Sequence, residues 1–480
     1  MLVAAFAVNA RITEPQSRLD HSGGGYAGVV LLIFLVACDP PVATGDSHAA
    51  DPAGRRTFGT LSLADAPVRY TGVAAGDAAG SASAGGDLDG DGVGDWVIGA
   101  RNANAGAGAV FVVRGPVAGG SLADADVRLE EGGSRELGWS VAVIPDLDGD
   151  GAGEILVGAP SSSDHAGEAW RLPGTLVGSV DSSAAIARFV GTERSEAGVR
   201  VGDSGEGWFV GAWLDAAAGY QAGALYLFDA GSGVFGPGDA IASRTGEQAE
   251  DWSAYGLSMA DATGDGVFDL LVGADGSDRA APDAGAAYFE PGPIVGHGTL
   301  ASATAILAGA AERDFAGHAV LIAGDVFGHG AGSVLVGALG VGDSDRVGAV
   351  YAYGTVATGE GSVSSAPVLL DGPGGDTLFG YSLASAGDVD GDGLFDVMVG
   401  ARYDEEGGYH AGATWLMYGP LDAGPSTETA VRFAGEFAED DAGYNPGGAA
   451  DVDGDGVEEL LFGAMGNDVA APGAGAVYAW

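Results

Sequence analysis

The chain has 480 residues and a formal net charge of −48, because 67 acidic residues stand against 19 basic ones. A surface this acidic repels the phosphates of nucleic acids and anionic lipid head groups, so the composition argues against both as partners. The single cysteine excludes a disulfide within the chain, so we expect the packed core and bound ions to supply the stability.

The N-terminal residues 1–37 predict an export signal of the lipoprotein type. An apolar run over 26–37 is too short to cross a bilayer as a helix, and it ends at Ala37 directly before Cys38. This order resembles a bacterial lipobox, which implies cleavage before Cys38 and lipid attachment to its thiol. An ordinary secretory signal followed by a chance cysteine is the alternative.

Residues 38–56 predict a flexible tether, because they are polar, contain proline and show no core-forming pattern. We therefore expect an exported protein that is lipid-anchored to the bacterial cell envelope or cell surface. The lipid would be its only contact with a membrane.

An acidic, glycine-containing loop followed by a short apolar run recurs along the rest of the chain. The clearest copy is Asp388–Asp396, which leads through 397–399 into Gly400 and Ala401. The glycine of this Gly-Ala pair recurs at 99, 158, 211, 273, 337, 400 and 463. Seven units of about sixty residues therefore fill residues 57–480.

Each unit contains four short runs that are bounded by glycine and rich in β-branched and aromatic residues, which is typical of β-strands. No helical period of 3.6 residues is present in the units. This pattern predicts an all-β fold, a seven-bladed β-propeller of four-stranded antiparallel blades. The seventh unit stops at its third run, and a matching fourth run lies at 61–70. We predict that 68–72 pairs beside 477–480, completes the last blade and closes the ring.

Five of the loops carry oxygen-bearing side chains at positions 1, 3, 5 and 9, and we call these the acidic loops. Calcium binds six to eight oxygens at about 2.3–2.6 Å, and crowded carboxylates repel one another unless a cation lies among them. Position 7 belongs to the predicted sites too, although it offers only a main-chain oxygen. The predicted calcium ligands are Asp87, Asp89, Asp91, Val93 and Asp95; Asp146, Asp148, Asp150, Ala152 and Glu154; Asp261, Thr263, Asp265, Val267 and Asp269; Asp388, Asp390, Asp392, Leu394 and Asp396; and Asp451, Asp453, Asp455, Val457 and Glu459.

The acidic loops have three other possible interpretations. An EF-hand needs a bidentate Glu at position 12, where this chain has Ile98, Val157, Val272, Val399 and Phe462. A catalytic magnesium site would not be repeated five times, and solvated acidic turns without metal are the third alternative. Thr263 is a weaker ligand than Asp, so we expect the weakest site in the fourth unit.

The order aromatic-Gly, Asp-x-Asp-Gly-Asp-Gly-x-x-Asp, apolar run and Gly-Ala resembles the FG-GAP repeat. This repeat is the blade unit of the integrin α-subunit N-terminal propeller and of many bacterial surface proteins, and the resemblance covers about residues 57–480. Most units depart from the pattern by lacking the final proline, which only Ala159-Pro160 keeps.

The resemblance implies structural cations between the two innermost strands of a blade, on the face opposite the ligand. It also implies non-catalytic adhesion, or binding of an unknown protein or glycan on the propeller face, and we expect a monomer. A secreted polysaccharide- or lipid-processing enzyme and a purely structural envelope protein are the alternatives. Ser140 and Ser382 lie in segments similar to a nucleophile elbow, but the second glycine is absent, and no catalytic residue is predicted.

Overall fold

The computed structural model describes residues 58–480, except 134, 342–346, 357 and 422–426. The predicted signal, the predicted tether and Cys38 lie outside the described residues. Within the described ranges, no helix has both the length and the apolar character that crossing a bilayer requires.

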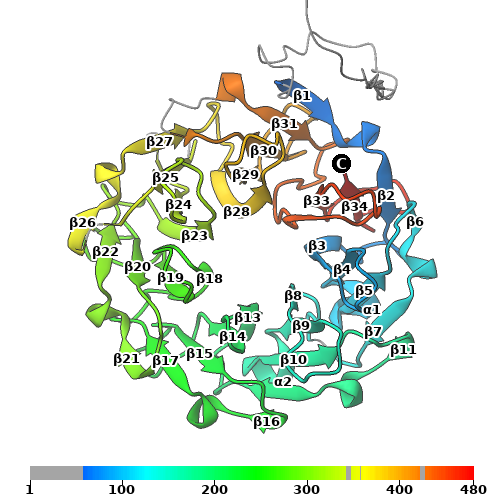
Figure 1. Cartoon of the computed structure of the whole chain (residues 1–480), viewed down its shortest axis with the longest axis horizontal. Helices are drawn as coiled ribbons and strands as arrows, with labels where there is room; N and C mark the ends of the chain where they lie inside the picture. The colour runs from blue at the N-terminus through cyan, green and yellow to red at the C-terminus, as the bar shows by residue number, and fades with distance from the viewer. Residues whose placement is uncertain (1–57, 134, 342–346, 357, 422–426) are drawn as a thin grey trace, which may run out of the picture. The chain divides into compact units, whose positions relative to one another are not determined.

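Seven β-sheets are arranged radially around a central axis, so the prediction of an all-β seven-bladed propeller is confirmed (Figure 1). We number the blades in chain order, and in each the first strand lies nearest the axis. The four antiparallel strands of blades one to three are β3 (Ala79–Gly86), β4 (Asp95–Ala100), β5 (Ala109–Val113) and β7 (Val127–Glu130); β8 (Ser140–Ile144), β9 (Glu154–Ala159), β10 (Glu168–Pro173) and β12 (Ala187–Val190); and β13 (Ala197–Asp203), β14 (Trp208–Ala212), β15 (Ala224–Phe228) and β17 (Ala242–Thr245).

Blades four to seven repeat the same order of strands. They are β18 (Leu257–Ala260), β19 (Asp269–Ala274), β20 (Ala286–Glu290) and β22 (Ala305–Ala308); β23 (Ala316–Ala323), β24 (Ser333–Ala338), β25 (Ala349–Tyr353) and β27 (Val368–Asp371); β28 (Phe379–Gly387), β29 (Asp396–Ala401), β30 (Ala413–Met417) and β31 (Val431–Ala434); and β32 (Ala449–Ala450), β33 (Glu459–Ala464), β34 (Ala476–Ala479) and β2 (Val68–Thr71). The helices α1 (Ala103–Gly106) and α2 (Ser162–His165) are single turns between strands two and three of the first two blades.

The prediction of four-stranded blades is wrong for six of the seven sheets, which have a fifth strand in parallel pairing with the fourth. Each fifth strand comes from the next blade along the chain, from the segment before that blade's own fourth strand. It covers the outer edge that a four-stranded blade would expose. Blade five has four strands among the described residues, and the matching segment of blade six lies at 422–426, outside them. The fifth strands are β11 (Gly178–Val180), β16 (Gly233–Phe235), β21 (Gly296–Thr299), β26 (Gly359–Ser362), β1 (Gly59–Ser62) and β6 (Gly120–Ser121).

The predicted closure of the ring is confirmed. Strand β2 pairs antiparallel with β34, with Val68 opposite Ala479 and Thr71 opposite Ala476. The main-chain N–H of Gly72 extends the ladder by donating to the Gly475 oxygen at 2.8 Å. Figure 1 shows the C-terminus beside β2, so the last blade is completed by the first part of the described chain.

Neighbouring blades pack through apolar side chains and through paired glycines. A Cβ added at Gly158 of the Gly-Ala pair in blade two would lie 1.9 Å from the Gly198 oxygen of blade three. The same approach joins Gly463 of blade seven to Gly80 of blade one, at 2.1 Å. The Gly-Ala glycine therefore recurs because the next blade leaves no room for a side chain.

Candidate metal centres

The acidic loops connect the first and second strands of their blades, as predicted for a propeller of this kind. The residue at position 1 holds the loop together by accepting main-chain hydrogen bonds. Asp87 accepts from Gly90 at 2.7 Å and from Gly92 at 3.0 Å, and both glycines have positive φ angles, of 78° and 90°. Asp146 accepts equivalent bonds from Gly151 and Gly149, and these lower the pKa of its carboxyl group.

The residue at position 9 begins the second strand and turns its carboxylate back into the loop. Asp95 is 1% exposed and accepts the N–H of Leu88, at position 2, at 2.9 Å. In the three acidic loops with Asp at position 9, the other oxygen accepts a glycine N–H from beyond the third strand, from Gly115, Gly292 or Gly419. Burial raises the pKa of Asp95, Glu154 and Glu459.

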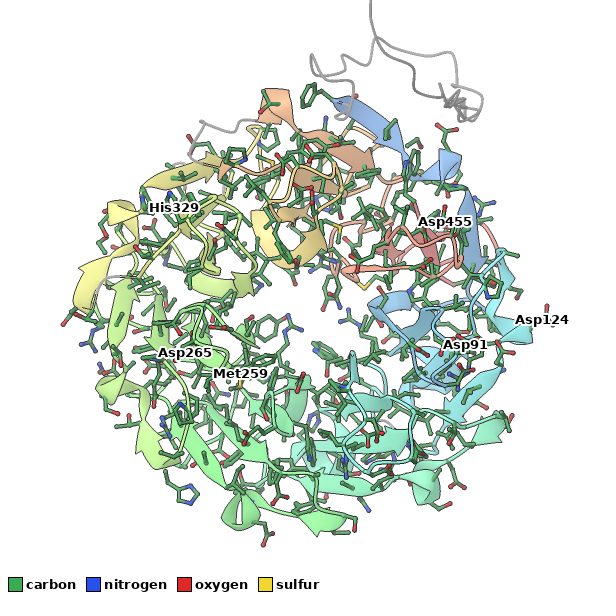
Figure 2. The ribbon with its side chains drawn as sticks, viewed as in Figure 1. Asp91, Asp124, Met259, Asp265, His329 and Asp455 are labelled. Atoms are coloured by element: carbon green, nitrogen blue, oxygen red, sulfur yellow. The ribbon has the colours of Figure 1, made fainter. Side chains whose placement is uncertain are left out.

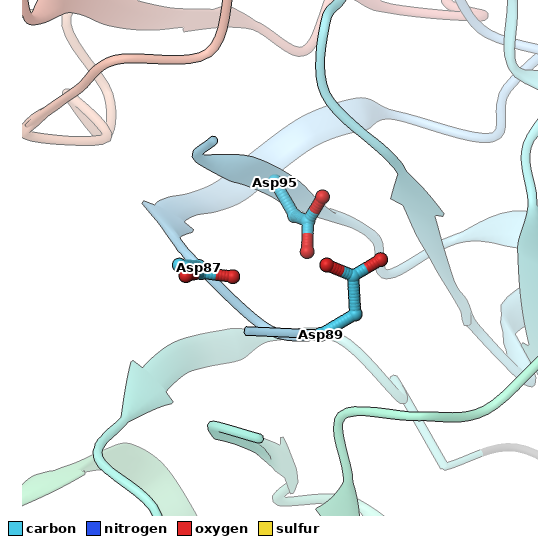
Figure 3. Close-up of side chains that lie close together, drawn as sticks. All are labelled: Asp87, Asp89 and Asp95. Atoms are coloured by element: carbon cyan, nitrogen blue, oxygen red, sulfur yellow. The ribbon is translucent and has the colours of Figure 1, made fainter. Parts of the chain in front are cut away.

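Positions 1, 3 and 9 converge in four of the five acidic loops. In each, three carboxylate oxygens lie within 4.8 Å of one another, and Figure 3 shows this arrangement for the first loop. Two oxygens bound to one calcium at about 2.4 Å are separated by at most about 4.8 Å, so these groups fit a shared calcium. The groups are Asp87, Asp89 and Asp95; Asp146, Asp148 and Glu154; Asp388, Asp390 and Asp396; and Asp451, Asp453 and Glu459.

The structure does not bring position 5 into these groups. Its carboxylate accepts the N–H of position 7 instead, for example Asp91 from Val93 at 2.8 Å and Asp455 from Val457 at 2.8 Å. Asp150 does the same with Ala152, Asp265 with Val267, and Asp392 with Leu394. Figure 2 shows Asp91, Asp265 and Asp455 in separate blades around the ring, together with His329 at the same position of the fifth blade.

The fourth loop keeps the fold of the others without their third carboxylate. Asp261 accepts from Gly264 and Gly266, and Asp269 accepts from Ala262, as in the other acidic loops. Thr263 stands where the other loops have Asp, so the fourth loop forms no three-carboxylate group among the described residues.

The loop of blade five keeps the main-chain hydrogen bonds that the position-1 aspartate accepts, which we call the frame, but it has an apolar side chain at position 3. Asp325 accepts from Gly328 at 2.7 Å and from Gly330 at 2.6 Å, and Ser333 accepts from Val326 in place of the position-9 carboxylate. Phe327 occupies position 3 and is 4% exposed. The frame therefore depends on the first aspartate and the glycines, and the remaining positions decide whether cation-binding oxygens converge.

Comparison with known proteins finds the FG-GAP repeat family at residues 137–170 and 379–417. These ranges contain the first two strands and the acidic loops of blades two and six, and they extend into the third strand of blade two and through that of blade six. Integrin alpha-5 of Xenopus laevis is 32% identical over 126 residues, covering 26% of this chain and 12% of the integrin. Integrin alpha-IIb of Homo sapiens is 32% identical over 162 residues, covering 32% of this chain and 15% of the integrin. The chain is an integrin-α-like FG-GAP propeller.

The matched regions span about an eighth of the length of these integrins. Among solved structures, the crystal structure of BBS1N in complex with ARL6DN, soaked with lead, aligns over 86% of this chain and 93% of that one. The TM-score of this alignment is 0.43 and the sequence identity is 10%.

The acidic loops of this FG-GAP propeller differ in whether an arginine side chain lies close to their carboxylates. In blade one, Arg114 binds Asp95 at 2.6 Å and lies 4.0 Å from Asp89. In blade two, the buried Arg171 lies 3.6 Å from Glu154. The position-9 residues of blades six and seven, Asp396 and Glu459, form no ion pair with the described residues. Burial, reinforced by Asp390 and Asp392, raises the pKa of Asp396 to about 7.

A second cluster, which the sequence interpretation missed, surrounds the axis at the opposite end of the first strands. Each blade contributes the third residue of its first run, and we call this set the axial ring. Its members are Ser81, Trp139, Val199, Tyr255, His318, Tyr381 and Tyr444. His318 packs between Tyr255 and Tyr381, with ring centroids 5.0 Å and 4.8 Å away, and Tyr381 lies 5.5 Å from Tyr444. Aligning the seven repeats would have shown an aromatic ring at five of the seven positions.

Arginines complete the axial ring where blades one and three have small or aliphatic residues. Arg101 lies 4.5 Å from the ring centroid of Trp139 and 4.9 Å from that of Tyr444. Arg200 lies 5.2 Å from the ring centroid of Tyr255. These distances are typical of cation–π contacts.

The two serines that resemble a nucleophile elbow follow the axial ring in sequence and have a structural role. Ser140 donates to the Gly198 oxygen at 2.8 Å, and Ser382 donates to the Gly443 oxygen at 2.7 Å. Each hydroxyl therefore joins its blade to the next one, at the glycine where the two blades touch.

Proposed function

We propose that this FG-GAP propeller is a calcium-stabilised binding protein of the bacterial cell surface, with a non-catalytic role in adhesion to a protein or glycan. The observation that carries the calcium assignment is the convergence of three carboxylate oxygens in each of four acidic loops. A buried carboxylate next to two others is costly unless a cation compensates the charge. Carboxylate and main-chain oxygens are the ligands that calcium prefers.

The proposed ligands are positions 1, 3 and 9 of each acidic loop, with the carboxylate of position 5 and the main-chain oxygen of position 7 completing the set. Position 5 would have to turn from the N–H of position 7 to reach the ion. Bound calcium would supply charge compensation and hold the first two strands of a blade together. The loop with Thr263 would be the fifth and weakest site.

Ligand binding is assigned to the face opposite the acidic loops, because the integrin-α resemblance implies it. The connections between strands two and three, such as 101–108 and 213–223, lie on this face, together with the axial ring. Anchoring is assigned to residues 1–38, with lipid on Cys38. A Cys38→Ala substitution would release the protein from the membrane fraction, whereas an unchanged distribution would contradict the lipid anchor.

The adhesion proposal is tested with purified protein that lacks residues 1–37. Its binding to arrays of glycans and of envelope and host proteins is measured with calcium present and with a calcium chelator. We expect saturable binding that the chelator abolishes. Absence of any ligand would favour the purely structural alternative, and turnover of a polysaccharide or lipid would favour the enzyme.

A further inference from the structure

An axial cavity of about 130 Å³ lies next to the axial ring and is lined by all seven blades. Its polar lining consists of Ser83, Ser140, Arg200, Ser382 and Asn445. None of the described residues that line it carries a carboxylate, although the chain has 67 acidic residues. Arg200 is therefore the charged group among the described lining residues, and it has no carboxylate beside it in the cavity.

Arg200 differs from the two other arginines at this end of the axis. The guanidinium of Arg402 binds Asp441 at 3.1 Å, and that of Arg101 donates to the Tyr444 hydroxyl at 2.6 Å. Arg200 stacks on Tyr255 and makes one long contact of 3.5 Å, to the Val199 oxygen. Among residues 58–480 apart from the undescribed gaps, it has no carboxylate within ion-pair distance. A half-buried guanidinium left in this state attracts an anion.

Ser83 supplies a second and independent sign of a ligand. Its side chain lines the same cavity, the residue is 7% exposed, and its hydroxyl has no hydrogen-bond partner in the described part of the chain. The hydroxyls of Ser140 and Ser382 are already donated to main-chain oxygens. Buried hydroxyls are nearly always paired, so the Ser83 O–H is a donor that lacks its acceptor.

We propose that this cavity binds a carboxylate group, held by the guanidinium of Arg200 and the hydroxyl of Ser83. The planar guanidinium can donate two parallel hydrogen bonds to the two carboxylate oxygens. The volume corresponds to about four water molecules, which suits a carboxyl group on one or two methylenes and is too small for a sugar ring. This proposal adds a ligand chemistry to the proposed binding function. Only the biological role of the site rests on that function, and the binding of a carboxylate does not.

The test uses the full chain with calcium at constant ionic strength, and trifluoroacetate as the probe, observed by fluorine NMR. Arg200→Gln removes the guanidinium, and Ser83→Ala removes the hydroxyl. Arg128→Gln is the matched control, because Arg128 pairs with Glu130 on an outer strand away from the axis. We expect saturable binding that weakens about tenfold in R200Q and severalfold in S83A, and that stays unchanged in R128Q. Acetate should displace the probe, and glucuronate should not.

Equal affinity of R200Q and the unsubstituted protein, equal weakening by R128Q, or displacement by glucuronate as well as by acetate would overturn the proposal. Absence of saturable binding to the unsubstituted protein would also overturn it. If R200Q does not fold, the trifluoroacetate affinity of S83A decides whether the proposal holds. Calcium-dependent melting of the same samples separates the two proposals, because loss of trifluoroacetate binding with an intact calcium shift contradicts only the axial site.

Discussion

Arg69 of β2 lies directly opposite Tyr478 of β34, and the side chains of both residues bind Glu436. Arg69 donates to Oε1 at 3.0 Å, and the Tyr478 hydroxyl donates to the same oxygen at 2.6 Å. Glu436 follows β31, so one carboxylate ties the first part of the described chain and its last strand to the sixth blade. The closure of the ring therefore depends on side chains as well as on the β ladder.

Replacing Glu436 by Gln should destabilise the closed ring. The side chain of Glu436 is 5% exposed, and Gln keeps an acceptor but loses the charge that strengthens both hydrogen bonds. We expect a loss of about 1–3 kcal/mol in the free energy of unfolding, measured by chemical denaturation. Glu130→Gln is the control, because Glu130 pairs with Arg128 on the surface and should cost less than about 0.5 kcal/mol. Equal losses in the two variants would contradict the role of Glu436 in closure.

The stabilisation by calcium should depend on pH through Asp396. Without an ion, burial raises the pKa of Asp396 to about 7, whereas the unfolded chain has the ordinary value near 3.8. The folded chain therefore holds an extra proton between these values, and this group's contribution to stability falls as pH rises toward 7. Calcium displaces that proton, so its affinity for the sixth loop should rise with pH over the same window.

The measurement is the calcium-induced increase in melting temperature at pH 5.5 and at pH 8. The increase should be larger at pH 8, and Asp396→Asn should reduce the difference between the two pH values. Asp396 accepts the N–H groups of Val389 and Gly419 with its two different oxygens. Asn is close in shape and keeps one of these acceptors, but it does not take up a proton in this pH range. A larger increase at pH 5.5 would reverse the expected sign and contradict the prediction.

Replacing Thr263 by Asp should strengthen the fourth site. The frame of this loop is already formed by Asp261 and Asp269, so the new carboxylate needs no change of the main chain. We expect one more tightly bound calcium per chain, counted by equilibrium dialysis. Thr263→Asn, which adds an oxygen without a charge, is the control and should have a smaller effect. An unchanged count in T263D would show that the fourth loop is not a calcium site.

The repeats allowed the blades and the ring closure to be predicted, because buried strands leave apolar runs of fixed spacing. Strands two and three lie between neighbouring blades and read as continuous apolar segments, such as 96–98 and 155–157. The match between 61–70 and 120–129 then identified the strand that completes the last blade. The acidic loops could be predicted because their residues are adjacent in sequence.

The fifth strands could not be predicted from side chains, because they are short, lie on the outer rim and share no apolar pattern. Gly359–Ser362 and Gly296–Thr299 are largely exposed and contain no apolar run. The axial ring was missed for another reason. Its members come from seven blades about sixty residues apart, so only an alignment of the repeats places them together. Phe327, buried at position 3 of the fifth loop, shows that one frame accommodates either carboxylates or a hydrophobic side chain.

The most direct test of calcium as the stabiliser of the ring is the number of calcium ions that the purified chain holds at equilibrium, measured together with its melting temperature. The three-carboxylate groups predict four tightly bound ions per chain, and the loop of Thr263 predicts a weaker fifth. At 100 times the dissociation constant, each site should stabilise the fold by about 2.7 kcal/mol, so a chelator should lower the melting temperature sharply. A chain that holds no calcium and melts at the same temperature with and without a chelator would contradict this assignment.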